Sequence, residues 1–211
     1  MAIDDLLDEH EQSEKVRTWL KDNALGLIGG IALGLALIGG WQWWQKQQEH
    51  ARVQTAERYQ SVVDDIKALK LKQAQSKVAA IDEGAYATLA ALRLSQAQLT
   101  AGQRDAAIAT LRGARPSDPA LAAIVTQRLA RLLIDAGKAE DALRLLPKDS
   151  TDAEVLQLQG DASYALGHRD EARAAYQQAL TRLDVAAPQR RLVELKLTQV
   201  GGTPPKPEAK I

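Results

Sequence analysis

The chain has 211 residues, and its 27 Lys and Arg residues balance 27 Asp and Glu residues, so no excess charge favours nucleic acid as a partner. It contains no cysteine, which excludes disulfide frameworks, thiolate catalysis and cysteine-ligated zinc. Phe is absent and the apolar content is mainly Ala and Leu, which favour helices over sheets. The composition therefore predicts an all-α protein.

The predicted N-terminal segment, residues 1–22, is acidic. Its carboxylates are Asp4, Asp5, Asp8, Glu9, Glu11 and Glu14. A run of like charges is usually a solvated tail, because the side chains repel one another and stay hydrated. The alternative is that a regulatory protein recognises this segment, and the residues leave both interpretations open.

A transmembrane helix is predicted at residues 23–45. From Ala24 to Trp44 the sequence ALGLIGGIALGLALIGGWQWW contains no charge, and about 21 helical residues at about 1.5 Å each span roughly 30 Å of hydrocarbon. A cleaved signal peptide would need a basic segment before the apolar run and small residues after it. Here an acidic segment precedes the run, so the pattern favours a retained anchor.

Tryptophans lie at both ends of this span, where their amphipathic rings match the boundary between lipid and water. The predicted interface residues are Trp19, Trp41, Trp43 and Trp44. They mark the depth at which the helix would sit in the bilayer.

The glycines Gly26, Gly30 and Gly34 recur at four-residue intervals, so they lie on one face of the predicted span. A row of small residues lets another membrane helix approach closely. Glycine is also common in membrane helices that make no such contact. These glycines are therefore a candidate helix-packing face, with ordinary span composition as the alternative.

The linking segment, residues 46–84, is predicted to be helical because residues 45–82 contain no Gly or Pro. Apolar residues recur there at three- and four-residue steps, as on one face of a helix. They are Val53, Ala56, Tyr59, Val63, Ile66 and Leu69. A second short apolar set, Ala74, Val78 and Ile81, ends at the Asp82-Glu83-Gly84 break. The segment is interpreted as an amphipathic helix followed by a shorter one, a degenerate helix pair.

The sequence repeats itself over residues 85–200, with a period of 35 and then 30 residues. In each copy a glycine is followed five residues later by an alanine and four residues further on by a large residue. The three sets are Gly102, Ala107 and Leu111; Gly137, Ala142 and Leu146; and Gly167, Ala172 and Tyr176. This pattern resembles the tetratricopeptide repeat, whose unit is two antiparallel helices in about 34 residues.

The third copy, LQLQGDASYALGHRDEARAAYQQAL, matches the repeat pattern best. Gly160 is expected to be small because the two helices cross there, and Tyr176 is expected to fill the space against the next pair. The first two copies carry Ser95 and Ala130 in place of Gly160, so their crossing geometry stays open.

Such units cannot bury their apolar faces alone, so they stack into a superhelix with a concave face and need a cap. Residues 186–200 are predicted to form this capping helix, with Pro188 in its first turn and an apolar side of Leu192, Leu195 and Leu197. Residues 201–211 follow as a flexible tail. The predicted fold is all-α: a single N-terminal transmembrane helix, then a tetratricopeptide-like helical-repeat superhelix with a C-terminal capping helix.

The sequence contains few candidate catalytic, metal-binding or partner-binding residues. His10, His50 and His168 lie in three different segments, so no metal or catalytic group is predicted, and no cofactor. In VTQRLARLL, Arg128 and Arg131 lie three residues apart on one helix face and could together hold a peptide carboxylate. Surface arginines are common on helices, so a solvated face is the alternative.

The order of these parts is similar to the YfgM family of ancillary SecYEG translocon subunits of Gram-negative bacteria. The resemblance extends over essentially the whole chain and includes the Gly-rich span with its Trp cluster and the segments QRLARLL and GDASYALGHRDEAR. No short catalytic motif supports the match, so the functional inference depends on architecture and segment similarity.

The resemblance implies a single-pass protein of the bacterial inner membrane, with a cytoplasmic N-terminus and a periplasmic repeat domain. Charge alone leaves this orientation nearly undetermined, because three basic residues flank each end of the span. The implied partners are the SecYEG translocon, the membrane-anchored periplasmic chaperone PpiD and unfolded secretory chains that are passed to periplasmic chaperones. The family also implies a link between the N-terminal segment and a cytoplasmic response regulator.

Three non-enzymatic functions follow as hypotheses. The first is a translocon adaptor that helps hand secretory chains to chaperones. The second is a signalling regulator that acts through the acidic N-terminus in a stress response. The third is a structural envelope scaffold whose repeats tether other proteins.

Overall fold

The structure is a computed structural model that describes residues 2–81 and 84–205, with side chains described for all of these except residues 2–12 and 51–52. Some predicted features therefore lie outside the described residues. They are the acidic side chains from Asp4 to Glu11, the Asp82-Glu83 break and residues 206–211 of the tail.

All regular structure in the described part of the chain is helical, so the predicted all-α class is confirmed. The helices are α1 (Ala2–Lys67), α2 (Leu71–Ala79), α3 (Ala85–Thr100), α4 (Arg104–Gly113), α5 (Pro119–Asp135), α6 (Ala139–Leu145), α7 (Ala153–Ala165), α8 (Arg169–Arg182) and α9 (Arg190–Gln199). The chain divides into two compact units, Met1–Gln54 and Thr55–Ile211.

The first unit contains α1 as far as Gln54, and the apolar part of this helix is long and apolar enough to cross a membrane. Its side chains are uncovered: Leu25 is 90% exposed and Ile28 is 68% exposed. A helix satisfies its own backbone hydrogen bonds, as a lipid environment requires, and so large an apolar surface is stable in lipid rather than in water. The predicted single N-terminal membrane-spanning helix is therefore confirmed in length, composition and conformation.

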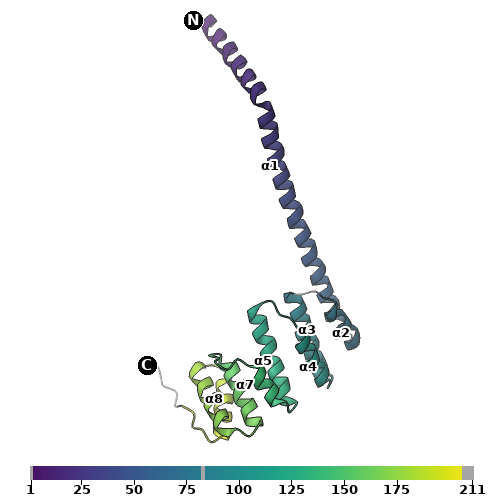
Figure 1. Cartoon of the computed structure of the whole chain (residues 1–211), viewed down its shortest axis with the longest axis vertical. Coiled ribbons are helices and arrows are strands. Elements are labelled where there is room, and N and C mark those ends of the chain that lie inside the picture. The colour runs from purple at the N-terminus through teal and green to yellow at the C-terminus, as the bar shows by residue number, and fades with distance from the viewer. Residues whose placement is uncertain (1, 82–83, 206–211) are drawn as a thin grey trace. The chain divides into compact units, whose positions relative to one another are not determined.

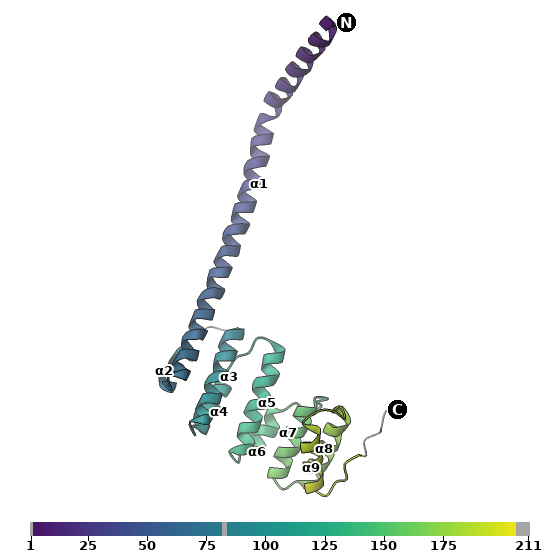
Figure 2. The same ribbon diagram turned by 180° about the vertical axis from the view of Figure 1, so that it is seen from behind.

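The second unit is a stack of helix pairs, which Figures 1 and 2 show following one another in chain order. Helices α3 and α4, α5 and α6, and α7 and α8 form three pairs, and α9 packs on α8 as a final single helix. Successive pairs also contact each other, α4 with α5 and α6 with α7. The predicted tetratricopeptide-like architecture with a capping helix is confirmed.

A further helix pair precedes these three, formed by the end of α1 and by α2. Val62 on α1 and Ala74 on α2 are both 0% exposed, and they share a core cluster with Ala90 and Leu94 of α3. This packing confirms the degenerate pair that the linking segment predicted. The turn between its helices lies at Leu69, which takes a left-handed conformation with φ 57°.

The three later pairs turn at glycines, as the repeat pattern predicted. Gly102, Gly137 and Gly167 have φ values of 74°, 73° and 82°, which favour glycine because it has no Cβ. At the last of them the Gly167 amide donates to the Tyr164 carbonyl (3.0 Å) and the His168 amide donates to the Ser163 carbonyl (2.9 Å). These bonds satisfy carbonyls that the end of α7 leaves free.

Facing positions of a helix pair compensate each other in size. A Cβ added to Gly160 on α7 would lie 2.5 Å from Cε1 and 2.7 Å from Cδ1 of Tyr176 on α8, so the ring needs glycine beneath it. Tyr176 is 2% exposed. The corresponding positions carry Ser95 with Leu111 in the first copy and Ala130 with Leu146 in the second, all buried. Compared with the third copy, the first two copies thus carry a larger residue on the first helix and a smaller one on the second.

The capping helix differs from its prediction in where it begins and in which side it buries. Helix α9 starts at Arg190, after Pro188, and buries Val193, Leu197 and Val200. Two of the three leucines predicted for the apolar side are exposed, Leu192 by 49% and Leu195 by 62%. Two rows of apolar residues run along this short helix. The row that packs against α8 is the one in line with Arg190, which contains Val193, Leu197 and Val200.

Buried Arg190 closes the end of α8. Its guanidinium donates to the carbonyl oxygens of Leu180 (3.2 Å) and Leu183 (3.0 Å) and to the Glu194 carboxylate (2.9 Å). Carbonyls at a helix C-terminus lack helical donors and carry partial negative charge, so a cation there is stabilising. This contact accounts for an arginine at a core position.

Replacing Gly160 by leucine should lower the free energy of unfolding by about 2 kcal/mol or more, because the added side chain overlaps the Tyr176 ring. Urea denaturation of the repeat domain would measure the change.

A compensating variant serves as the control. Gly160→Ala combined with Tyr176→Leu recreates the Ala130 and Leu146 combination and should be more stable than Gly160→Ala alone. If Gly160→Leu unfolds at the same urea concentration as the parent, the assigned pairing of α7 with α8 is wrong.

Candidate partner-binding surfaces

The exposed face of α5 carries the two arginines singled out in the sequence. Ile124, Arg128, Arg131 and Asp135 are exposed at steps of four, three and four residues, so they form one stripe along the helix. The structure thus places both arginines on one exposed face of the first helix of a pair. Their role in binding remains a prediction.

A similar stripe runs along α3, the first helix of the preceding pair. Leu89 is 37% exposed and Arg93 is exposed, and each lies 35 residues before its counterpart on α5, Ile124 and Arg128. Helices α3 and α5 contact each other. The two stripes therefore form a basic and partly apolar surface, which the sequence analysis recognised only on α5 although the 35-residue period could have revealed both halves.

The two arginines of α5 differ in their bonding. Arg131 forms an ion pair with Glu154 of α7, and beside it Gln127 donates to the Asp152 carboxylate at 3.0 Å. Asp152 also accepts from the Glu154 amide at 2.8 Å, which caps α7. Arg128 makes no hydrogen bond or ion pair with the described residues. Arg131 consequently helps to join α5 to α7, and Arg128 is the guanidinium available to an incoming carboxylate.

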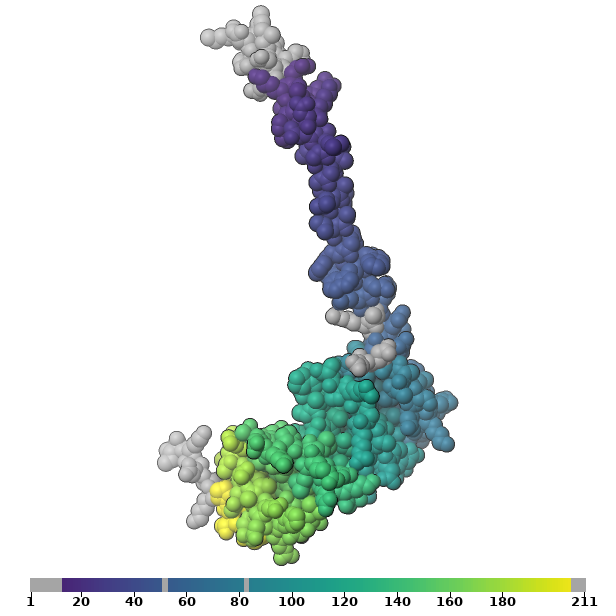
Figure 3. Space-filling view, viewed as in Figure 1, coloured from purple at the N-terminus to yellow at the C-terminus, as the bar shows by residue number. Residues whose placement is uncertain are grey.

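Two apolar crevices open between successive pairs and meet at Ala114. The first, of about 350 Å³, lies among α2, α3 and α4 and is lined by residues such as Val78, Ala91 and Leu94. The second, of about 510 Å³, lies among α4, α5 and α6 and includes Leu129. Figure 3 shows the teal and green surface of these pairs. Both crevices combine apolar side chains with a few polar ones.

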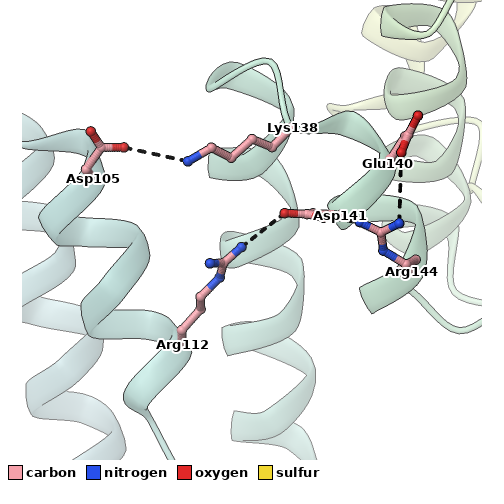
Figure 4. Close-up of polar contacts among 6 residues, drawn as sticks. All are labelled: Asp105, Arg112, Lys138, Glu140, Asp141 and Arg144. Atoms are coloured by element: carbon pink, nitrogen blue, oxygen red, sulfur yellow. Dashed lines mark hydrogen bonds and ion pairs between the residues drawn. The ribbon is translucent and has the colours of Figure 1, made fainter.

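Charged residues on α4 and α6 border the second crevice (Figure 4). Asp141 accepts from Arg144 and from Arg112, the latter at 3.2 Å, while Lys138 lies 3.9 Å from Asp105. The hydrogen bond from Arg144 is the main reason that the pKa of Asp141 is below its usual range, and Arg112 adds to it. These exposed pairs hold the two helices in register and make the rim polar, although each contributes little to stability.

Asp161 links the last three helices of the described chain. It accepts from the hydroxyl of Tyr176 at 2.8 Å and from Lys196 of α9 at 2.7 Å. Burial, and then the charge of Asp161, raise the pKa of Tyr176 above its ordinary value. The tyrosine therefore stays protonated and donates this hydrogen bond, which is a structural role.

No metal-ligating group is found among the described side chains. His168 lies 3.4 Å from Glu171 on the exposed start of α8, and no third ligand joins them. His10 lies outside the described side chains, and His50 is exposed on α1.

In the first unit, the glycines predicted to pack against another membrane helix lie on an exposed helix surface. A Cβ added to Gly26, Gly30 or Gly34 would meet no described atom within 4 Å, and the role of these glycines in helix packing remains a prediction. The predicted interface tryptophans are exposed, and the rings of Trp41 and Trp44 lie 5.3 Å apart at a tilt of 42°. They border a shallow hollow with Ala36, Leu37 and Gly40.

Comparison with known proteins gives a family match over most of the chain. The family model described as a tetratricopeptide repeat-like domain matches residues 17–202, which include both the apolar helix and the helix pairs.

Three relatives bear the name "Ancillary SecYEG translocon subunit". The protein from Escherichia coli K12 is 28% identical over 92% of this chain and 97% of its own length. The protein from Haemophilus influenzae is 26% identical over 82% of this chain and 89% of its own length. The protein from Aggregatibacter actinomycetemcomitans is 22% identical over 92% of this chain and 98% of its own length. The chain therefore belongs to the tetratricopeptide repeat-like family matched here, and the resemblance to the YfgM proteins is confirmed.

Proposed function

We propose that this protein is a non-enzymatic, membrane-anchored adaptor of the SecYEG translocon. The observation that carries the proposal is the extent of the match: relatives named ancillary SecYEG translocon subunit align with 92% and 82% of this chain, and the family model spans both the apolar helix and the helix pairs. An adaptor needs an anchor and a binding surface; the apolar helix would be the anchor, and the exposed surface of the repeat domain would be the binding surface.

The anchor would act in the inner membrane and contact the translocon through its small-residue row. Gly26, Gly30 and Gly34 carry no side chains that would hold a second helix away, and their surroundings are open. Without a hydrophobic driving force between helices in lipid, close backbone approach is what favours association. The N-terminus would be cytoplasmic and the repeat domain periplasmic.

The repeat domain would receive unfolded secretory chains and pass them to periplasmic chaperones such as the membrane-anchored PpiD. The inter-pair crevices would accept apolar side chains of such a segment, and Arg128, on the exposed face of α5 and without a carboxylate partner among the described residues, would hold an acidic group. A signalling role for the acidic N-terminus would add a cytoplasmic response regulator as a partner.

The first test concerns orientation. A single cysteine introduced as Ser13→Cys should be protected from a membrane-impermeant thiol reagent in intact spheroplasts, whereas Thr151→Cys on the exposed repeat domain should be labelled. The natural chain has no cysteine, so each label reports one site. Permeabilised spheroplasts should label both variants, and the opposite pattern in intact spheroplasts would place the repeat domain in the cytoplasm.

The second test concerns the anchor. Gly30→Leu with Gly34→Leu should strongly reduce co-purification of SecYEG from detergent extracts, because two leucines hold a neighbouring helix away. Leu33→Ala with Leu37→Ala changes the same region without adding bulk and serves as the control. Unchanged recovery of SecYEG with the leucine variant would exclude this face as the docking site.

The third test concerns the repeat surface. Arg128→Glu should weaken photocrosslinking of an emerging secretory chain to the repeat domain several-fold, because repulsion replaces attraction at one contact among several. The domain should remain folded, since Arg128 is exposed and unpaired within the described structure. Arg182→Glu, on the exposed end of α8, is the matched control. Equal crosslinking in all three proteins would show that recognition lies elsewhere.

A further inference from the structure

Helix α9 exposes a short apolar face although it closes the repeat domain. Arg191, Leu192 and Leu195 are exposed on one side of the helix, and we name them the outer face of α9. Leu195 alone is 62% exposed. Large apolar residues grouped on a well-packed helix are a common mark of an interaction surface.

Aligning α9 with α7, the first helix of the preceding pair, shows which side of such a helix this face corresponds to. Leu197 of α9 lies 35 residues after Ala162 of α7, and both are 0% exposed. Leu158 and Val193 are a second fully buried pair at this offset. The same offset relates Leu195 to Gly160, on which the Tyr176 ring of α8 lies. The outer face of α9 is therefore the side that the second helix of a pair covers in α7.

The chain does not supply that second helix in its described part. In the earlier pairs the second helix begins two residues after the turn glycine, as α8 begins after Gly167. Gly201 repeats the left-handed turn with φ 80°, and its amide donates to the Thr198 carbonyl at 2.9 Å. Residues 202–205 then run on without helical structure and include Pro204 and Pro205. Helix α9 is thus the first helix of a pair whose second member is absent from residues 202–205.

We propose that the outer face of α9 binds an amphipathic helix of a partner protein, which takes the place of this second helix. Helix-in-groove recognition of this kind uses a few apolar anchors on one face of the incoming helix. The inference extends the proposed adaptor function by specifying the segment that docks, and it does not depend on contact with the translocon.

Two features of the face specify the incoming helix. A large residue on the first helix of a pair accompanies a smaller one on the second, so Leu195 requires Ala or Gly opposite it, the reverse of Gly160 and Tyr176. Arg191 makes no ion pair with the described residues, so an Asp or Glu of the incoming helix would complete the contact. A second copy of this chain would instead bring leucine against leucine and arginine against arginine.

The test places a photoreactive amino acid at position 195 of the full chain in its native membrane. After irradiation, mass spectrometry should map the crosslink to a helical segment of a different protein, with Ala or Gly within one turn of the linked residue. Adding Leu192→Glu to this chain should lower the crosslink yield roughly tenfold, as expected for loss of an apolar anchor. Leu69→Glu, at the 83% exposed turn between α1 and α2, is the control and should leave the yield unchanged.

The remaining outcomes each overturn the inference: a crosslink to a second copy, to residues 206–211 of the same chain, to lipid or to a non-helical segment, or no crosslink at all. Circular dichroism should show that Leu192→Glu melts like the parent, because Leu192 is exposed. Co-purification of SecYEG with the same variant separates the two proposals. If SecYEG is retained while the helix crosslink is absent, this inference fails and the adaptor function stands.

Discussion

The repeat domain depends on how closely two helices of a pair can approach. Between α7 and α8 the limit is set by Gly160, which leaves room for the buried Tyr176 ring and for its hydrogen bond to Asp161. Asp161 also holds Lys196, so the same contact that closes one pair orients the capping helix. Because interiors are packed without spare volume, a change in one residue of such a pair must be matched by its partner.

Polar contacts then determine how successive pairs are joined and which groups remain for binding. Arg131 is bound to Glu154 and Arg112 to Asp141, and these guanidinium groups connect adjacent pairs. Arg128, one helical turn from Arg131, has no such partner in the described structure. The distinction matters because Glu154 already neutralises Arg131 and takes up part of its guanidinium, whereas no carboxylate among the described residues occupies Arg128.

The two units are stable in different solvents. The apolar part of α1 is stable where lipid surrounds it, whereas the helix pairs bury their apolar residues against one another in water. In the proposed function, a partner in the membrane would contact the small residues of α1, whereas segments in water would contact the crevices, the basic stripe and the outer face of α9. This division suits an adaptor that must hold several proteins near one site.

The amino-acid sequence by itself determined the all-α class, the membrane-spanning helix and the helix pairs. These features depend on local properties: a long uncharged run, glycines that permit left-handed turns at Gly102, Gly137 and Gly167, and apolar residues at helical spacing. Gly160 was also predictable as a close-packing position, because the repeat pattern requires a small residue there.

The tertiary structure alone decided which of two apolar rows α9 buries and which of two neighbouring arginines is free. Leu192 and Leu195 have the same hydrophobicity and helical spacing as the buried residues, so only contact with α8 separates the two rows. Arg128 and Arg131 are likewise indistinguishable in sequence, and their difference arises because Glu154, on another helix, lies within reach of one of them. Side-chain spacing within a helix specifies its faces, whereas the neighbour of each face is specified by the packing of the whole domain.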